Sequence, residues 1–172
     1  MKLLYSIHKY DVFMFTWLIN ARMYSTLTRV SRYLSKTGDG QLYLLIIGLL
    51  YWRLGIESPC LQAVLLGFLI ERPVYFVLKN GLKRNRPEAA LINFHSIITP
   101  SDKFSFPSGH TSATFMMATV LGYYFPPLII PLYCWATLVG FSRVVLGVHF
   151  PTDILVGIIL GFSTALFSLG QI

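Results

Sequence analysis

Three ionisable residues, Arg143, His149 and Asp153, lie close together between two long apolar runs near the C-terminal end of the chain. Ionisable side chains at the edge of a bilayer are costly, so they mark a candidate functional site. Pro151 suits the first position of a new helix, and Asp153 then lies in its first turn, within reach of His149. A carboxylate held against one imidazole nitrogen leaves the other free to attack or to accept a proton. Arg143 offers a planar guanidinium that suits phosphate. The alternative interpretation of the three residues is that Asp153 caps a helix while Arg143 and His149 lie at the membrane interface and do no chemistry.

A second polar cluster, Pro107-Ser108-Gly109-His110, precedes another apolar run. Ser108 is a good N-cap, and the free N–H groups of a helix start, together with the positive end of the helix dipole, form an anion site. Gly109 lets an anion approach the backbone closely, which holds His110 beside that anion. The alternative is an ordinary helix cap with an interfacial histidine.

A third cluster is basic and consists of Lys79, Lys83, Arg84 and Arg86, the last followed by Pro87. Such a cluster beside a lipid surface either binds phosphate or supplies the positive charge that sets topology and holds acidic lipids. The sequence favours phosphate binding only if the fold brings this cluster near the other two.

The composition indicates which kind of element must position these clusters. Of the 172 residues, 55% are hydrophobic and only 12% are charged, whereas a soluble domain carries about 25% charged residues. We therefore expect a single membrane-embedded domain over residues 1–172. The formal net charge of +7 is scattered between apolar runs, which indicates anionic lipid head groups or a phosphorylated substrate as partners rather than nucleic acid.

Five apolar runs are predicted to form transmembrane helices, and a weaker N-terminal stretch adds a sixth helix. The five runs cover residues 41–56, 60–80, 110–125, 128–142 and 152–170. Residues 8–35 are interrupted by charges, so we expect them to form a poor span or an interfacial helix. The predicted fold is therefore all-α, an integral membrane six-helix bundle with five firm transmembrane helices. Gly157 and Gly161 are placed to allow close helix approach in the last span.

Each crossing of the bilayer changes the side on which the chain emerges, and counting the crossings places all three clusters on one face. Cations and a helix start there neutralise the oxygens of a phosphoryl group. One histidine, oriented by a carboxylate, is the nucleophile, and a second histidine protonates the leaving oxygen. No set of carboxylates or cysteines resembles a metal cage, so we expect neither a metal ion nor a cofactor. Taken together, the three clusters predict phosphoryl transfer.

In order and spacing, the three clusters resemble the three-part signature of the type 2 phosphatidic acid phosphatase superfamily: Lys79 through Arg86-Pro87, then Pro107-Ser108-Gly109-His110, then Ser142-Arg143 through His149 to Asp153. The resemblance implies a six-helix membrane bundle and metal-independent dephosphorylation through a phosphohistidine. It implies that His149 is the nucleophile, that Asp153 orients it, and that His110 is the general acid. The phosphate-binding residues that it implies are Lys79, Arg86, Ser108, Gly109 and Arg143.

Members of this superfamily dephosphorylate several lipids, so the resemblance leaves the substrate open. By family analogy we favour the conversion of undecaprenyl diphosphate to undecaprenyl phosphate. The alternatives are hydrolysis of phosphatidylglycerophosphate, diacylglycerol diphosphate, phosphatidic acid or lipid A, transfer of the phosphoryl group to another lipid, and lipid-phosphate binding or transport without catalysis. The analogy implies an integral protein of the bacterial inner membrane with a periplasmic site, whereas the positive-inside rule favours a cytoplasmic one.

Two further features carry predictions of their own. Glu71-Arg72-Pro73 interrupts the helix over residues 60–80, and we expect a kink with a structural ion pair there. Because adjacent residues do not share a helix face, the expected partner of Glu71 is Arg22 or Arg53. The Thr37–Gly40 segment falls on the same face as the three clusters, and we expect it to form a plain turn.

Overall fold

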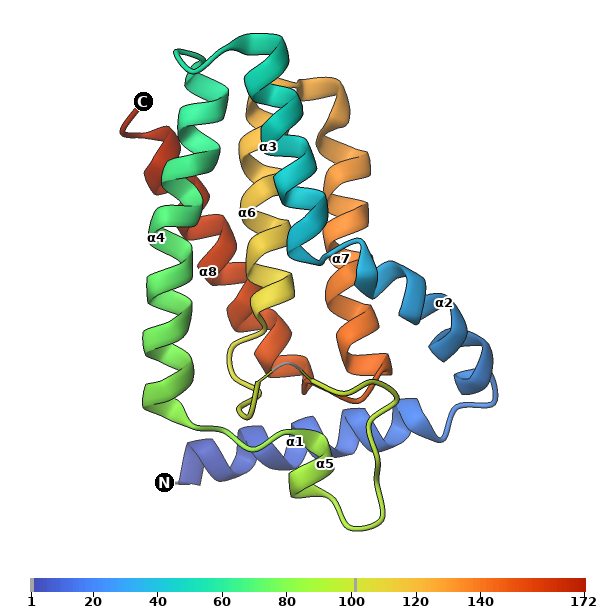
Figure 1. Cartoon of the computed structure of the whole chain (residues 1–172). Coiled ribbons are helices and arrows are strands. Elements are labelled where there is room, and N and C mark those ends of the chain that lie inside the picture. The colour runs from blue at the N-terminus through green and yellow to red at the C-terminus, as the bar shows by residue number, and fades with distance from the viewer. Residues whose placement is uncertain (1, 101) are drawn as a thin grey trace.

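The computed structural model describes residues 2–100 and 102–172, and this part of the chain folds into helices and loops without a strand (Figure 1). The predicted all-α class is thereby confirmed. The helices are α1 (Lys2–Ile19), α2 (Tyr24–Lys36), α3 (Gly40–Leu54), α4 (Pro59–Leu82), α5 (Pro87–Ala90), α6 (Gly109–Tyr124), the 3₁₀ turn η1 (Pro126–Leu128), α7 (Ile129–Val145) and α8 (Pro151–Leu169).

Helix α6 is the centre of the bundle and packs against α4, α7 and α8. Every residue from Thr111 to Gly122 is buried, as expected of a helix with small or apolar side chains all round. Two glycines of α8 make the close packing possible. A Cβ atom at Gly157 would lie 2.8 Å from the Ser108 carbonyl oxygen, and one at Gly161 would press on the Ser112 carbonyl. The predicted close approach of this last helix is confirmed.

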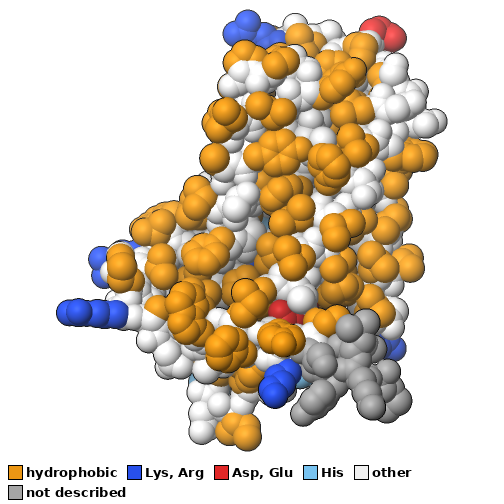
Figure 2. Space-filling view, turned by 180° about the vertical axis from the view of Figure 1, so that it is seen from behind, with side chains coloured by type: hydrophobic (Ala, Val, Ile, Leu, Met, Phe, Trp, Pro, Cys, Tyr) orange, Lys and Arg blue, Asp and Glu red, His pale blue; other side chains and the backbone are white. Residues whose placement is uncertain are grey.

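The flank of the bundle is apolar, as a membrane protein requires. Within the described residues, three helical stretches are long and apolar enough to cross a bilayer, namely Pro59–Ala90, Pro126–Val145 and Pro151–Leu169, and Gly40–Leu54 is a shorter apolar helix. Figure 2 shows hydrophobic side chains spread over the flank, with Lys and Arg side chains toward the two ends. The five predicted spans coincide with α3, α4, α6, α7 and α8. The chain is therefore an integral membrane protein.

The N-terminal region differs from the prediction of a single helix over residues 8–35. It forms two helices, with a turn at residues 20–23 where the Asn20 side chain donates to the Thr16 carbonyl at 2.9 Å. Helix α1 lies across one end of the bundle (Figure 1), as expected of an interfacial helix. Helix α2 packs against α7 and leads into α3. With α2 and the short α5 added, the predicted count of six helices is not matched.

The three polar clusters meet at the end of the bundle that α1 covers. This end holds the C-terminal ends of α4 and α7 and the N-terminal ends of α6 and α8 (Figure 1). The backbone N–H of Ser108 donates to the carbonyl of Asp153 at 3.1 Å, which joins the starts of α6 and α8 directly. The packing of Phe15 of α1 against Phe150 fixes α1 beneath this junction.

Candidate active site

His149 and Asp153 form a buried pair at the start of α8. His149 is 2% exposed, and its Nδ1 atom lies 3.6 Å from Oδ2 of Asp153, an ion-pair contact that is longer than a hydrogen bond. The same carboxylate oxygen accepts the backbone N–H of Phe150 at 2.8 Å, which fixes its position. Burial lowers the pKa of His149 to about 3; Asp153 opposes this shift, and Arg86 and Arg143 add to it. The imidazole is therefore neutral near pH 7, which is the form that attacks phosphorus.

Arg84 holds the Asp153 carboxylate from the other side and ties it to α1. Its guanidinium donates to Asp153 Oδ1 at 2.8 Å and pairs with Asp11 Oδ2 at 2.6 Å. Asp11 also accepts the backbone N–H of Thr152 at 3.0 Å. Arg84 belongs to the basic cluster predicted from the sequence, in which no role of its own was assigned to it. Its pairing with Asp11 was missed because the two residues come from segments that only the tertiary fold brings together.

Lys79 and Arg86, two of the predicted phosphate-binding residues, are gathered around the carboxylate of Asp102. Lys79 Nζ lies 2.9 Å from Asp102 Oδ2, and the Arg86 guanidinium pairs with Oδ1. Tyr75 donates its hydroxyl to Asp102 at 2.8 Å. Burial raises the pKa of Asp102, but hydrogen bonds from Lys79 and Tyr75 and the nearby charges outweigh it and hold the pKa at about 2. Arg86 Nη1 also donates to the Val148 carbonyl at 2.5 Å, which places this cation next to His149.

The start of α6 carries the second predicted cluster. Ser108 is the N-cap, and its hydroxyl oxygen accepts the Thr111 hydroxyl at 2.9 Å. A Cβ atom at Gly109 would lie 2.8 Å from the Tyr75 ring, so this position has room only for glycine. His110 Nε2 lies 2.8 Å from Oδ1 of Asp39. The Thr37–Gly40 segment is therefore more than the plain turn we expected, because it supplies a carboxylate to the predicted general acid.

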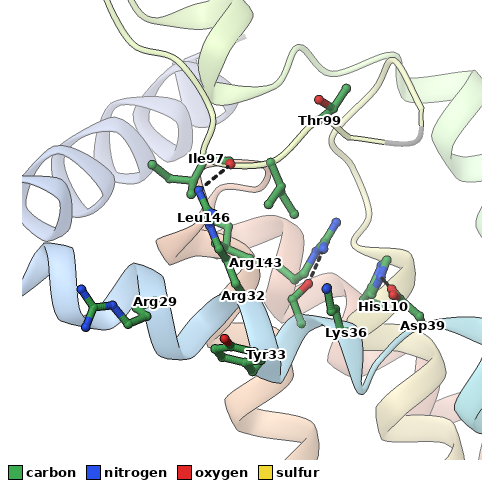
Figure 3. A pocket seen from close by; sticks show the side chains of 12 residues that line it. Arg29, Arg32, Tyr33, Lys36, Asp39, Ile97, Thr99, His110, Arg143 and Leu146 are labelled. Carbon is green, nitrogen blue, oxygen red and sulfur yellow. Dashed lines mark hydrogen bonds and ion pairs between the residues drawn. The ribbon is translucent and has the colours of Figure 1, made fainter.

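Arg143 and His110 line one cavity of about 620 Å³ beside helix α2 (Figure 3). Arg143 is 6% exposed, and its Nη1 atom donates to the Ser35 hydroxyl at 2.6 Å. Its Nε atom is buried without a hydrogen-bond partner in the part of the chain that the structure describes. A buried guanidinium with spare donor capacity beside a cavity is suited to receive an oxyanion.

The expected partners of Glu71 were wrong. Its carboxylate pairs with neighbouring Arg72, whose Nη2 lies 2.6 Å from Oε1, and it also accepts the Ser112 hydroxyl. The long arginine side chain folds back along α4, so adjacent positions can pair even though their Cα–Cβ bonds diverge. Arg72 Nη2 also donates to the Gly109 carbonyl at 3.2 Å, so the expected structural ion pair joins α4 to the start of α6.

Comparison with known proteins matches this arrangement to one family. A family model described as the PAP2 superfamily matches residues 60–172, which include all three clusters. The chain is 32% identical over 99 residues to decaprenylphosphoryl-5-phosphoribose phosphatase of Mycobacterium tuberculosis; the match covers 55% of this chain and 51% of that protein. The chain therefore spans about half the length of this curated relative.

Two solved structures share the fold. Aquifex aeolicus LpxE superposes with a TM-score of 0.81 at 28% identity, covering 92% of this chain and 94% of that one. The PAP2-type phosphatidylglycerolphosphate phosphatase of Bacillus subtilis superposes with a TM-score of 0.79 at 27% identity, covering 96% and 86%. The resemblance seen in the sequence is confirmed, and the chain belongs to the PAP2 superfamily.

Proposed function

We propose that this protein is a metal-independent membrane lipid phosphatase that works through a phosphohistidine on His149. The observation that carries the proposal is the convergence of the buried His149–Asp153 pair with Arg86, Arg143 and the start of α6 at one end of the bundle. A neutral histidine beside a carboxylate and several cations has the chemistry for nucleophilic attack on phosphorus. Names of relatives that refer to lipid phosphates support the same reading.

The reaction proceeds in two steps. His149 attacks the phosphorus atom while Asp153 stabilises the imidazolium that forms, and His110 protonates the leaving oxygen. Water then attacks the phosphohistidine, with His110 accepting a proton, and inorganic phosphate leaves. Lys79, Arg86 and Arg143, with the N–H groups that follow Ser108 and Gly109, neutralise the charge of the phosphoryl oxygens in both steps.

The lipid tail enters from the side of the bundle between α3 and α4. A cavity of about 480 Å³ lies there and is lined by apolar residues of α3 and α4, including Leu44, Leu65 and Phe68. Leu44 is 72% exposed, so the cavity is open toward the surrounding lipid. His110 and Asp39 line this cavity as well as the polar one, which puts the proposed general acid between the path of the tail and the phosphate site.

Among lipid phosphates, our proposed substrate is undecaprenyl diphosphate, by analogy with the family. Phosphatidylglycerophosphate, phosphatidic acid and lipid A are the alternatives within the same chemistry. The whole of residues 1–172 acts as one phosphatase domain in this proposal, in the bacterial inner membrane with the site on the periplasmic side.

The test is phosphate release by the purified protein in detergent with excess EDTA. Undecaprenyl diphosphate, phosphatidylglycerophosphate and phosphatidic acid are offered in parallel, with His149→Ala as the inactive variant and His95→Ala, an exposed loop histidine, as the matched control. We expect release that survives EDTA, is lost in His149→Ala and persists in His95→Ala. Release that EDTA abolishes, or that His149→Ala retains, contradicts the mechanism.

The same assay separates the rival functions. Release that appears only after an acceptor lipid is added, with label found on that lipid, identifies a phosphotransferase. Binding of these lipids with no turnover under any of the conditions identifies a lipid-phosphate binding or transport protein.

A further inference from the structure

Helix α2 presents a row of three basic residues to the cavity that contains Arg143 and His110. Arg29, Arg32 and Lys36 follow one another at helical spacing, so they share one face of α2. All three line the same cavity of about 620 Å³. In Figure 3, Arg32 extends from α2 to the Ile97 carbonyl, Lys36 lies on the side of His110, and Arg29 lies at the far end of the row.

Among the described residues, these α2 cations share with Arg143 the lack of a carboxylate partner, whereas three other basic residues of the site have one. Lys79, Arg84 and Arg86 are each paired with an aspartate. In contrast, the salt bridges among described residues include none to Arg29, Arg32 or Lys36. In the described part of the chain, the hydrogen bond of the Arg32 side chain is to the Ile97 carbonyl, at 3.5 Å.

The cavity therefore has an excess of positive charge. Its described lining holds these three cations and Arg143 but one carboxylate, that of Asp39, which already pairs with His110. Such a concave surface lined by one sign of charge concentrates ligands of the opposite sign. The lining is thus suited to an anion in addition to the phosphoryl group that is transferred.

The position of His110 identifies which part of a substrate reaches the cavity. In the proposed mechanism the transferred phosphoryl group lies between His149 and Arg143, and the leaving oxygen lies next to His110. His110 and Arg143 both belong to the cavity wall, so the polar part of the group attached to the leaving oxygen can lie in this cavity while its tail lies in the cavity between α3 and α4, which His110 also lines. Surroundings this cationic favour a leaving group that is itself a phosphate over a neutral alcohol such as diacylglycerol.

We propose that Arg32 and Lys36 form a second anion subsite that binds the phosphate retained by the leaving group, so that the substrate class is a lipid diphosphate. This inference rests on the proposed phosphatase function and deepens it. A bond forms between His149 and the terminal phosphorus atom, and the bond from that phosphorus to the bridging oxygen breaks. The electron pair stays on the bridging oxygen, which takes a proton from His110, and the lipid monophosphate is held by Arg32 and Lys36. Water then cleaves the phosphohistidine to inorganic phosphate, and its proton returns to His110.

The test compares undecaprenyl diphosphate with undecaprenyl monophosphate as substrates of the Arg32→Gln/Lys36→Gln double variant in detergent. We expect kcat/KM for the diphosphate to fall by about a hundredfold, roughly tenfold for each charged contact, and kcat/KM for the monophosphate to change less than about threefold. The matched control, Arg22→Gln/Arg53→Gln, removes the same charge outside the cavity and leaves both values unchanged.

A second measurement is independent of the double variant and uses methylenediphosphonate, an unreactive diphosphate, as an inhibitor. We expect it to inhibit the single variants Arg32→Gln and Lys36→Gln more weakly than it inhibits the wild type.

The outcomes separate this inference from the proposed function. If the wild type hydrolyses the diphosphate through His149 but the double variant and the single variants behave as wild type, the subsite is refuted and the phosphatase stands. An equal loss for both substrates also refutes it, because the cations then serve the transferred phosphate. If the wild type hydrolyses neither lipid, both proposals fail. The phosphate that binds to α2 could instead come from the head groups of bilayer phospholipids, and repeating the comparison in neutral and in anionic nanodiscs tests this source. If the double variant loses only the response of its activity to anionic phospholipid, α2 binds bilayer head groups and the subsite is refuted.

Discussion

Among the cations of the site, Lys79 and Arg86 share one carboxylate partner, that of Asp102. Both contact Asp102, which is partly exposed in the loop before α6. Because the pKa of this carboxyl group is held at about 2, Asp102 is ionised at every working pH. A substrate phosphate has the same sign of charge and needs the same donors, so it must displace Asp102 to bind both cations.

We therefore predict that Asp102→Asn tightens the binding of phosphate analogues. The inhibition constant of vanadate is expected to fall by about tenfold, which corresponds to about 1.4 kcal/mol, because the amide no longer competes for Lys79 and Arg86. Glu88→Gln, which removes a carboxylate that contacts His95 and Ser96 instead, is the control and leaves the inhibition constant unchanged. Weaker inhibition in Asp102→Asn speaks against competition and shows that the carboxylate holds the two cations in place.

Single residues also mark the limit of what the sequence predicts. Residues such as His149 and Arg143 are recognisable because their types and spacing within a short stretch restrict the chemistry. Their partners are not: Asp39 and Asp102 lie in loops whose positions depend on tertiary packing. A charge in a loop is most often solvated, so nothing local distinguishes Asp39 or Asp102 from an ordinary surface aspartate. The catalytic roles themselves stay predictions until variants are measured.

At the scale of elements, the contact between α6 and α8 positions the site. The N–H of Ser108 reaches the Asp153 carbonyl only because Gly157 and Gly161 let the two helix backbones approach each other. Without bulky side chains between them, van der Waals packing of the backbones stabilises the pair inside a membrane. The phosphate-binding helix start and the nucleophile thus depend on two positions that carry no functional group.

Gly161→Ala is expected to destabilise the protein by about 1–3 kcal/mol, the usual cost of overpacking a well-filled interior. The added Cβ atom meets the Ser112 carbonyl of α6, which is backbone and cannot rotate away. Gly48→Ala in α3 is the matched control, since a Cβ atom there has nothing within 4 Å. The measurement is the midpoint of unfolding in detergent. Equal midpoints for the two variants would show that α6 and α8 tolerate separation.

The elements themselves were predictable to different degrees. The five bundle helices follow apolar runs bounded by prolines and glycines, so the sequence locates them well. Helices α1 and α2 were merged into one because residues 20–23 contain neither proline nor glycine, and local sequence has no other strong breaker. Their separation depends on packing, since α1 contacts α7 and α8 at the end of the bundle whereas α2 packs along α7.

At the scale of the whole molecule, the open question is which side of the membrane the site faces. Basic residues gather at the end of the bundle that holds the site, which by the positive-inside rule favours the cytoplasm. Several of these residues are occupied: Lys79, Arg84 and Arg86 pair with aspartates within the fold. The rule counts lysines and arginines whether or not they later pair with carboxylates, so it still opposes the periplasmic site that we propose from family analogy. The periplasmic site proposed from family analogy and the cytoplasmic site favoured by the charge rule are therefore two alternatives that a labelling experiment separates.

Cysteine labelling decides the orientation. The background is Cys134→Ser, which removes the exposed native thiol and keeps the buried Cys60. In this background, Lys103→Cys places a thiol in the loop at the end of the bundle that holds the site. Glu57→Cys places a thiol in the turn between α3 and α4, at the opposite end. We expect a membrane-impermeant maleimide added to intact spheroplasts to label position 103 and not position 57, because a periplasmic site exposes only the first. Everted vesicles are expected to give the reverse pattern, and detergent-solubilised protein to be labelled at both positions. Labelling of position 57 alone in spheroplasts would place the site in the cytoplasm. A lipid carrier that returns on the outer leaflet could not reach His149 there. The proposed substrate would then be a phospholipid made on the inner leaflet instead of undecaprenyl diphosphate.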